Sequence, residues 1–434
     1  MKHLPYRLAA VLLVLCMALA ILPASAEKVN LTEQGVFKAP PGEIRMYEVG
    51  DITVDQYGAI FAKSENSHVI VNAGNLSGKD CDVCADAWGG SVVINYGDLA
   101  TVDGVIGQIR TNGSAFVRVT GGNCSTVNGS QGFLIREEES SAVRMKIGAI
   151  ELKGKYGIIA FLEDSSRLTF STTKIKNDGE YGVFMQAHGK GTGTETFVTL
   201  WADELEATGT ALEFQQYGSG YYSEFVFGKV KAGDIALRLM LDRGNVADVL
   251  VKEDITSGRI GVKIYSGDQV KLIVLGTISA GEAPILVADM SGMSGWGVDG
   301  KAQAILAWRI IPTASGHVAM LQGKETDTVV ESSKTEPFEK AIRYIIRMEE
   351  SDKAAFTLKN ADGEDIRRSF GYPVACEGER VLVEVQAADG YKVTGVMNGE
   401  EEKVPLEQDE NGNWYFDVPR GGGISLFAVT EPAT

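Results

Sequence analysis

The sequence contains few histidines, cysteines and prolines. Among its 434 residues are four histidines, five cysteines and eleven prolines. A structural zinc site usually takes four cysteine or histidine ligands, but Cys81 and Cys84 are the only closely spaced cysteines. Calcium-binding Gly-Gly-x-Gly-x-Asp repeats are also missing. We therefore expect neither a metal site nor a cofactor, and the sequence leaves open whether Cys81 and Cys84 are free thiols or bridged across a turn.

Long apolar runs are missing too, except at the N-terminus. There Lys2 and Arg7 accompany an apolar run over residues 8–22, and Ala24-Ser25-Ala26 follows it. A basic start, a short apolar core and an A-x-A site are typical of a secretory signal peptide, and the core is too short for a convincing transmembrane helix. We expect residues 1–26 to be a signal peptide. The mature protein would then be secreted, extracellular or held at the cell surface, without insertion into the membrane.

Basic residues are outnumbered by acidic ones. The chain has 41 Lys and Arg against 58 Asp and Glu, which gives a formal net charge of −17. A surface of this sign repels phosphate backbones and anionic headgroups. The composition therefore argues against nucleic-acid and anionic-membrane partners.

What the sequence does contain is a short phrase that recurs about every 25 residues between residues 50 and 307. Each copy has an apolar anchor residue, and seven of the ten anchors have Gly two positions earlier. The anchors are Ile52, Leu76, Leu99, Cys124, Ile150, Ile175, Leu205, Val230, Ile255 and Ile278. A fixed period of this length indicates a stack of similar units, each too small to bury a core alone.

Between the anchors, apolar residues alternate with polar ones, as in the pairs Val117 and Val119 or Val183 and Met185. Period-two alternation is typical of β-strands with one face in the core. The spacing and the Val, Ile, Phe and Thr content argue against a helical solenoid. We predict an all-β fold: an N-terminal cap over residues 27–49, then a right-handed parallel β-helix of about ten rungs, with three short strands per rung, over residues 50–307.

One strand of the repeat is apolar on both faces. Its outward positions are expected to hold Ile60, Ile106, Leu134, Ile159, Phe161 and Phe184, and then a polar set of Gln186, Glu213, Arg238, Lys263 and Tyr265. A strand that is apolar on both faces is normally covered on both. A cap, a long turn, a second copy of the chain or a ligand could provide this cover.

The longest turns of the repeat are rich in glycine and aromatic residues. They lie near residues 187–194, 215–222 and 290–296. Aromatic rings stack on the apolar faces of sugars, and loops on one side of a solenoid often bind ligands. The predicted ligand-binding residues are Tyr217, Tyr221, Tyr222, His188, Lys190 and Trp296, with Trp88 as a further candidate. The plain alternative is that these segments are solvated turns.

The period fails after residue 307, where we predict a C-terminal cap and linker (308–341) and a small β-rich module (342–431). The module contains Asp389-Gly390-Tyr391, Asn398-Gly399, Gly412-Asn413-Trp414-Tyr415-Phe416 and Pro419 in that order. This order resembles the Listeria–Bacteroides or internalin B-repeat modules of bacterial surface proteins. The chain departs from them in having one copy and a Gly421-Gly422-Gly423 run. The resemblance implies a secreted or cell-surface bacterial protein, and such modules have no known catalysis.

The rungs resemble those of parallel β-helix proteins, the pectate-lyase-like solenoids. Pectin-cleaving hydrolases of this fold use paired Asp residues together with Gly-His-Gly and Arg-x-Lys. This chain has Ala187-His188-Gly189 and an Arg259 to Lys263 run, but no Asp-Asp pair. A glycosidase needs two carboxyls across one bond, and the predicted strand face stacks none. We therefore predict no catalytic residues.

The sequence thus predicts a binding or adhesin-like protein. Its partners would be extracellular polysaccharides or surface glycans of a host or bacterium. The alternative is a polysaccharide-degrading enzyme, either a lyase or a glycoside hydrolase, on the same scaffold.

Overall fold

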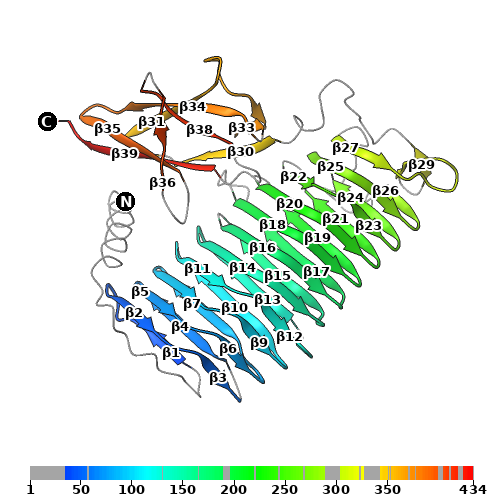
Figure 1. The fold of residues 1–434 in the computed structure, drawn as a ribbon, viewed down its shortest axis with the longest axis horizontal. Coiled ribbons are helices and arrows are strands. Elements are labelled where there is room, and N and C mark those ends of the chain that lie inside the picture. The colour runs from blue at the N-terminus through cyan, green and yellow to red at the C-terminus, as the bar shows by residue number, and fades with distance from the viewer. Residues whose placement is uncertain are drawn as a thin grey trace. The chain divides into compact units, whose positions relative to one another are not determined.

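The computed structural model contains only β-strands as regular elements among the residues it describes (Figure 1). The described residues are 35–55, 58–129, 131–164, 166–188, 196–218, 221–242, 245–266, 269–288, 304–321, 324–326, 343–349, 351, 353–369, 372–376, 378–398, 404–409, 412–418 and 424–433. The expected signal peptide and the predicted site residues Lys190 and Trp296 lie outside them. None of the described segments forms a helix of the length and hydropathy that a membrane crossing requires.

Two large sheets build a β-solenoid of about nine turns, which confirms the predicted parallel β-helix and comes close to the predicted ten rungs. The first sheet has 13 strands in the order β1(Gly35–Lys38), β4(Ile60–Glu65), β7(Val83–Trp88), β10(Val105–Asn112), β13(Gln131–Glu137), β15(Tyr156–Glu163), β17(Tyr181–His188), β19(Thr210–Tyr217), β21(Ile235–Leu241), β24(Ile260–Ser266), β26(Ala283–Val287), β28(Ala319–Leu321) and β29(Lys324–Thr326). Neighbouring strands of this sheet run parallel where their register is described, except the terminal pair β28–β29, which is antiparallel.

The second sheet has 16 strands. Its main strands are β2(Ile44–Glu48), β5(His68–Asn72), β8(Ser91–Asn95), β11(Phe116–Gly121), β14(Ala142–Leu152), β16(Arg167–Asn177), β18(Thr196–Ala207), β20(Tyr221–Ala232), β22(Val246–Val251), β25(Gln269–Ala280) and β27(Ala304–Ile310). The short strands are β3(Ile52–Val54), β6(Leu76–Gly78), β9(Leu99–Thr101), β12(Cys124–Thr126) and β23(Ile255–Ser257). Three separate strands per rung are therefore found in the first rungs and again at β22, β23 and β24. In β14, β16, β18, β20 and β25 the third predicted strand of one repeat continues into the anchor strand of the next, which gives one strand of 11 or 12 residues.

The predicted anchor residues form one column of register partners. Ile52 pairs with Leu76, and the pairing continues through Leu99, Cys124, Ile150, Ile175 and Leu205. Each of these side chains is at most 1% exposed. The sequence period thus fixes both the height of a rung and which residues fill the core.

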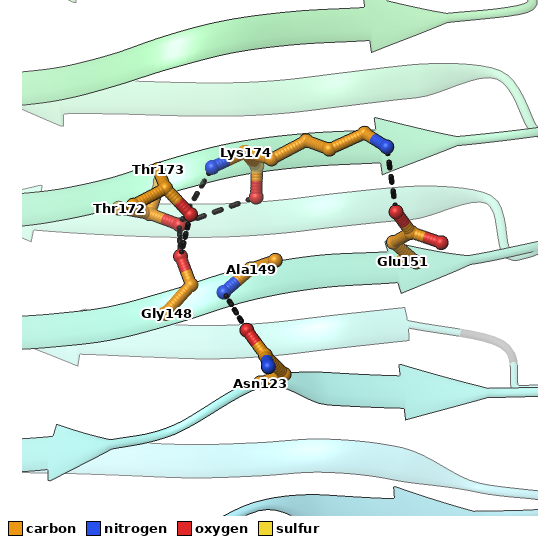
Figure 2. Close-up of polar contacts among 7 residues, drawn as sticks. All are labelled: Asn123, Gly148, Ala149, Glu151, Thr172, Thr173 and Lys174. Carbon is orange, nitrogen blue, oxygen red and sulfur yellow. Dashed lines mark hydrogen bonds and ion pairs between the residues drawn. The ribbon is translucent and has the colours of Figure 1, made fainter.

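The glycines before the anchors are explained by side chains from the rung before. Asn75 accepts a hydrogen bond at Oδ1 from the backbone N–H of Asp98 (2.9 Å), and Asp98 Oδ1 accepts one from Asn123 N–H (2.7 Å). Asn123 Oδ1 in turn accepts one from Ala149 N–H (3.0 Å; Figure 2). A Cβ on the glycine of the following rung would collide with this side-chain oxygen, as at Gly148, where the separation would be 2.8 Å. Glycine is therefore required one rung after each such Asp or Asn.

The series of hydrogen bonds that link Asp and Asn side chains to the next rung, here called the ladder, changes where an alanine occupies the Asp or Asn position. Ala149 offers no side-chain acceptor, and the next rung carries Thr173 in place of the usual glycine. The Thr172 and Thr173 hydroxyls both donate to the Gly148 carbonyl (2.7 Å each; Figure 2). Beside them Lys174 Nζ lies 2.6 Å from Glu151 Oε1. Hydroxyls thus replace the carboxamide as links between rungs.

The C-terminal residues form two small sheets. One has six strands in the order β32(Arg368–Ser369), β33(Tyr372–Cys376), β30(Arg343–Met348), β39(Ile424–Pro432), β35(Tyr391–Asn398) and β36(Val404–Pro405). The other has four, β31(Ala354–Asn360), β34(Arg380–Ala387), β38(Trp414–Asp417) and β37(Glu407–Gln408). All pairs are antiparallel except β30–β39. The predicted turn at Gly412 lies between the paired strands β37 and β38, with φ +81°.

By the clustering of its contacts, the chain forms two compact units. One comprises Met1–Tyr222 and Ala232–Asn245, and the other comprises Ser223–Lys231 and Val246–Thr434. The predicted boundaries at 49, 307 and 341 stay predictions.

Candidate ligand-binding site

Four aromatic rings gather on the outer face of β15 and β17. In these strands the inward residues Ile158 and Val183 are fully buried, and Phe161 and Phe184 alternate with them on the outer side. The rings of Tyr156 and Tyr181, each followed by a glycine, lie against Phe184. We call Tyr156, Phe161, Tyr181 and Phe184 the aromatic patch. Two consecutive strands contribute the same pattern because the 25-residue period places Tyr181 directly beside Tyr156.

The rings of the patch contact one another. The Tyr156 and Tyr181 rings are stacked, with centroids 5.2 Å apart and planes 11° apart. Phe184 lies 5.6 Å from both tyrosine rings and 6.4 Å from Phe161, in tilted or edge-on geometry. All four side chains are half-buried. The patch therefore presents aromatic surface that is held in place by its own ring contacts and by the sheet beneath.

Apolar side chains extend the patch toward β13. Leu134 is the register partner of Ile159, which is 8% exposed and has Phe184 as its partner on the other side. The prediction of an outward apolar set is thus correct for these residues. It is wrong for Ile60 and Ile106, which are both fully buried. In these early rungs Ile60 and Gly107 are both register partners of Val83, which faces the core. The inward positions therefore lie at a different distance from the preceding glycine than they do in later rungs.

A network of polar side chains borders the patch on β17, β19 and β21. We call Gln186, Glu213, Gln215, Tyr217 and Arg238 the polar relay. Arg238 donates to Glu213 Oε2 (2.7 Å) and Gln215 Nε2 to Glu213 Oε1 (2.6 Å). Gln186 Nε2 (2.6 Å) and the Tyr217 hydroxyl (2.8 Å) both donate to Gln215 Oε1. The side chain of Glu213 is 5% exposed, so the ion pair at the centre of the relay is shielded from water.

The structure brings two of the predicted site residues together. His188 and Tyr217 are register partners, and their rings stack with centroids 4.8 Å apart and planes 22° apart. Tyr222 lies in β20 rather than in a turn and is only 4% exposed, so its ring faces no solvent. Tyr221 opens β20, but its side chain lies outside the described part. Trp88 ends β7, is 51% exposed and donates from Nε1 to Asp86 Oδ1 (2.7 Å).

Burial raises the pKa of Tyr181 to about 12, and the carboxyl groups of Glu213 and Glu180 beside the aromatic patch add to the rise. Glu213 is engaged by Arg238, and no group of three or more His, Cys, Asp and Glu side chains that could hold a metal ion is found in the described segments. In the second compact unit, burial raises the pKa of Glu224 to about 7, and the charge of Asp248 adds to the rise. These two residues belong to β20 and β22 of the other sheet.

Cys81, Cys84 and Cys124 form no disulfide bond. Cys81 and Cys124 are buried, and Cys84 lies on the outer side of β7. Burial raises the pKa of each of these three thiols to about 12. Thiols in this state are poor nucleophiles and metal ligands. The Cys-x-x-Cys pair is therefore no reactive site in this structure.

The tyrosines of the patch and the connectivity of the relay were not predicted from the sequence. A signal for the tyrosines is present: Lys155-Tyr156-Gly157-Ile158 and Glu180-Tyr181-Gly182-Val183 recur one period apart. The relay has no comparable signal, because its members come from three strands and their contacts depend on the register between rungs.

Comparisons with protein-family models, with curated proteins and with solved structures find no match to this chain. The fold defines it as a parallel β-helix protein. Its function has to be argued from the aromatic patch and the polar relay.

Proposed function

We propose that this protein is a secreted bacterial binding protein of the adhesin-like kind, and that the aromatic patch binds carbohydrate. The observation that carries the proposal is the stack of Tyr156 and Tyr181 beside Phe161 and Phe184. Sugar rings have an apolar face that packs on aromatic rings and hydroxyls that need fixed hydrogen-bond partners. The patch and the neighbouring polar relay offer both on one sheet face.

The repeat geometry suits an extended polymer. Strands of one sheet are spaced about 4.8 Å apart, so equivalent side chains recur at that interval along the solenoid. The outer face from β13 to β21 carries Leu134, the patch and then the relay without interruption. A polysaccharide chain lying along the solenoid axis would contact several rungs at once.

The small C-terminal sheets support the proposed cellular role. Their antiparallel pairs and the turn at Gly412 agree with the β-rich module that resembles internalin B-repeats. In this proposal the signal sequence directs secretion, the module belongs to the surface-protein type, and the solenoid, of the pectate-lyase-like kind, carries the ligand site.

Affinity electrophoresis tests the proposal. Purified protein is run through gels cast with soluble polysaccharides, and Phe161→Ala/Phe184→Ala is compared with the parent. Each lost stack is expected to cost on the order of 1–3 kcal/mol, so the double variant should bind about tenfold more weakly or worse. Phe61→Ala is the matched control, because Phe61 occupies the same outward column in β4, away from the patch.

Two outcomes would count against the proposal. Parent protein that is retarded by no polysaccharide would remove carbohydrate as the ligand. Release of reducing sugar from a bound polysaccharide would instead support the alternative, a polysaccharide-degrading enzyme.

A further inference from the structure

Gln186 ends a series of hydrogen bonds whose direction is set at the buried Glu213–Arg238 pair. The ionised carboxylate of Glu213 can only accept hydrogen bonds, so Gln215 must turn Nε2 toward it. This leaves Gln215 Oε1 facing away, and that oxygen is also only an acceptor. Gln186 must therefore approach Gln215 with its own Nε2, at 2.6 Å. The ion pair thus fixes which way both amides point.

The consequence is that Gln186 Oε1 is directed away from the relay. Within the described part of the chain, no hydrogen bond reaches this oxygen, and Gln186 is half-buried. Gln186 lies in register between Phe161 on one side and Gln215 on the other. A fixed hydrogen-bond acceptor therefore stands directly beside a ring of the aromatic patch.

We infer that Gln186 Oε1 makes the patch selective for neutral, hydroxyl-bearing sugars by accepting a hydrogen bond from a hydroxyl of the sugar ring stacked on the patch. This inference rests on the proposed function, because it names the ligand class of the same surface. A hydroxyl group can satisfy the acceptor, whereas an O-methyl group or a carboxylate at that place cannot. An acceptor left unpaired on binding lowers affinity.

The charges around the patch agree with a neutral ligand. The one carboxylate of the relay, Glu213, is paired with Arg238, and the chain carries a net charge of −17. A polyanion would be repelled by the protein as a whole.

Two cations at the patch would favour an anionic glycan. The Arg136 guanidinium carbon lies 5.8 Å from the centroid of the Phe161 ring. Lys155 Nζ lies 5.1 Å from the centroid of the Tyr156 ring and 3.8 Å from Glu180 Oε2. The choice between a neutral and an anionic ligand is therefore open to direct measurement.

Gln186→Leu removes the acceptor at nearly constant size. Gels are cast with galactomannan, xyloglucan or mixed-linkage β-glucan, with O-methylated forms of each, and with polygalacturonate or chondroitin sulfate as polyanions. Parent protein should be retarded by at least one neutral polysaccharide, and at least fivefold less by its O-methylated form or by the polyanions. Gln186→Leu should bind the unmodified polysaccharide about fivefold to tenfold more weakly, because the sugar hydroxyl loses its hydrogen-bond acceptor. It should bind the methylated form at least as tightly as the parent does, since the contact is already lost there and leucine leaves no acceptor unpaired.

Gln108→Leu is the matched control, because Gln108 faces outward from β10, outside the relay. It should bind like the parent. Glu213→Gln tests the fixed direction: a glutamine at this position can present oxygen or nitrogen to Gln215, so the preference for the unmodified over the methylated polysaccharide should fall. A purely structural role of Glu213 would lower both affinities equally.

The inference is overturned if Gln186→Leu binds the unmodified polysaccharide as tightly as the parent, or if polyanions are bound best, while Phe161→Ala/Phe184→Ala still abolishes binding. If the parent binds no polysaccharide, the proposed function fails and the inference falls with it. The two failures are thus distinguishable in one set of gels.

Discussion

At the scale of single residues, Glu137 is an acidic side chain buried inside the solenoid. It ends β13 with its side chain inside and is fully buried, and the backbone N–H groups of Arg167 and Val143 approach its carboxyl and oppose only part of the effect of burial. Its register partners are Thr111 and Leu162, which supply no positive charge. Burial therefore raises the pKa of Glu137 well above its usual value.

This shift predicts a pH dependence of stability. An unfolded glutamate ionises near pH ~4.3, whereas folded Glu137 keeps its proton to higher pH. The folded state is thus favoured fully below that pH and loses stability as pH rises toward the folded pKa. Glu137→Gln cannot ionise, so its melting temperature should rise relative to the parent between pH 4 and pH ~8. Circular-dichroism melts across this range provide the measurement.

Glu163→Gln serves as the control for Glu137, because Glu163 is an exposed carboxyl at the end of β15. The difference in melting temperature between Glu163→Gln and the parent should stay constant across the same pH range. Melting curves of Glu137→Gln and the parent that shift in parallel with pH would show that Glu137 is not the source of the dependence.

At the scale of elements, the ladder of Asp and Asn side chains predicts which glycines can be replaced together with a neighbour. A Cβ added at Gly97 would collide with the Asn75 side chain, whereas the nearest backbone atom, Asn75 N, lies at an ordinary 3.5 Å. Gly97→Ala should therefore destabilise the fold by about 1–3 kcal/mol. The double variant Asn75→Ala/Gly97→Ala should lose less free energy of unfolding than the sum of the losses in the two single variants, because removing the Asn75 side chain makes room for the new Cβ at position 97. Urea denaturation of the four proteins completes the cycle.

Gly122 provides the contrasting case. A Cβ there would meet not only the Asp98 side chain but also the Gly97 carbonyl oxygen at 2.8 Å and its carbon at 3.0 Å. Truncating Asp98 cannot relieve a collision with backbone. Asp98→Ala/Gly122→Ala should thus show little or no rescue, and equal rescue in both pairs would contradict the ladder as the reason for these glycines.

The same elements show how far the sequence leads. The 25-residue period can be read from the order of residues alone. It therefore predicts the anchor column, the parallel fold and most outward residues correctly. It misplaces Ile60 and Ile106 because the strands of the early rungs start at different distances from their glycines. The polar relay depends on contacts such as Gln186 to Gln215, 29 residues apart, and these follow only once the register between rungs is known.

At the scale of the whole molecule, a solenoid has no core apart from its stacked rungs. Each rung contacts only its neighbours, so one defective rung interrupts the stack. Ile150 is fully buried and pairs with Cys124 and Ile175. Ile150→Asp would bury an unpaired carboxylate at a cost of several kcal/mol, against a total stability of roughly 5–15 kcal/mol. We expect this variant to be unfolded or insoluble when expressed, as judged by circular dichroism and size-exclusion chromatography.

Glu151→Gln is its control, since Glu151 is the exposed neighbour and makes only a surface ion pair with Lys174. That change should alter stability by less than about 1 kcal/mol. A soluble Ile150→Asp protein with the parental melting temperature would mean that the anchor column does not face the core.

The stacking of Tyr156 on Tyr181 also bears on how such a surface could evolve. The two residues belong to consecutive copies of one repeat, 25 residues apart, and they meet because the copies are in register. An in-frame duplication of residues 156–180 would insert one more rung and, with it, one more tyrosine in the same row. A duplication or deletion of DNA that encodes one whole repeat would therefore lengthen or shorten the aromatic surface by one rung. The contacts between the remaining rungs would keep their geometry.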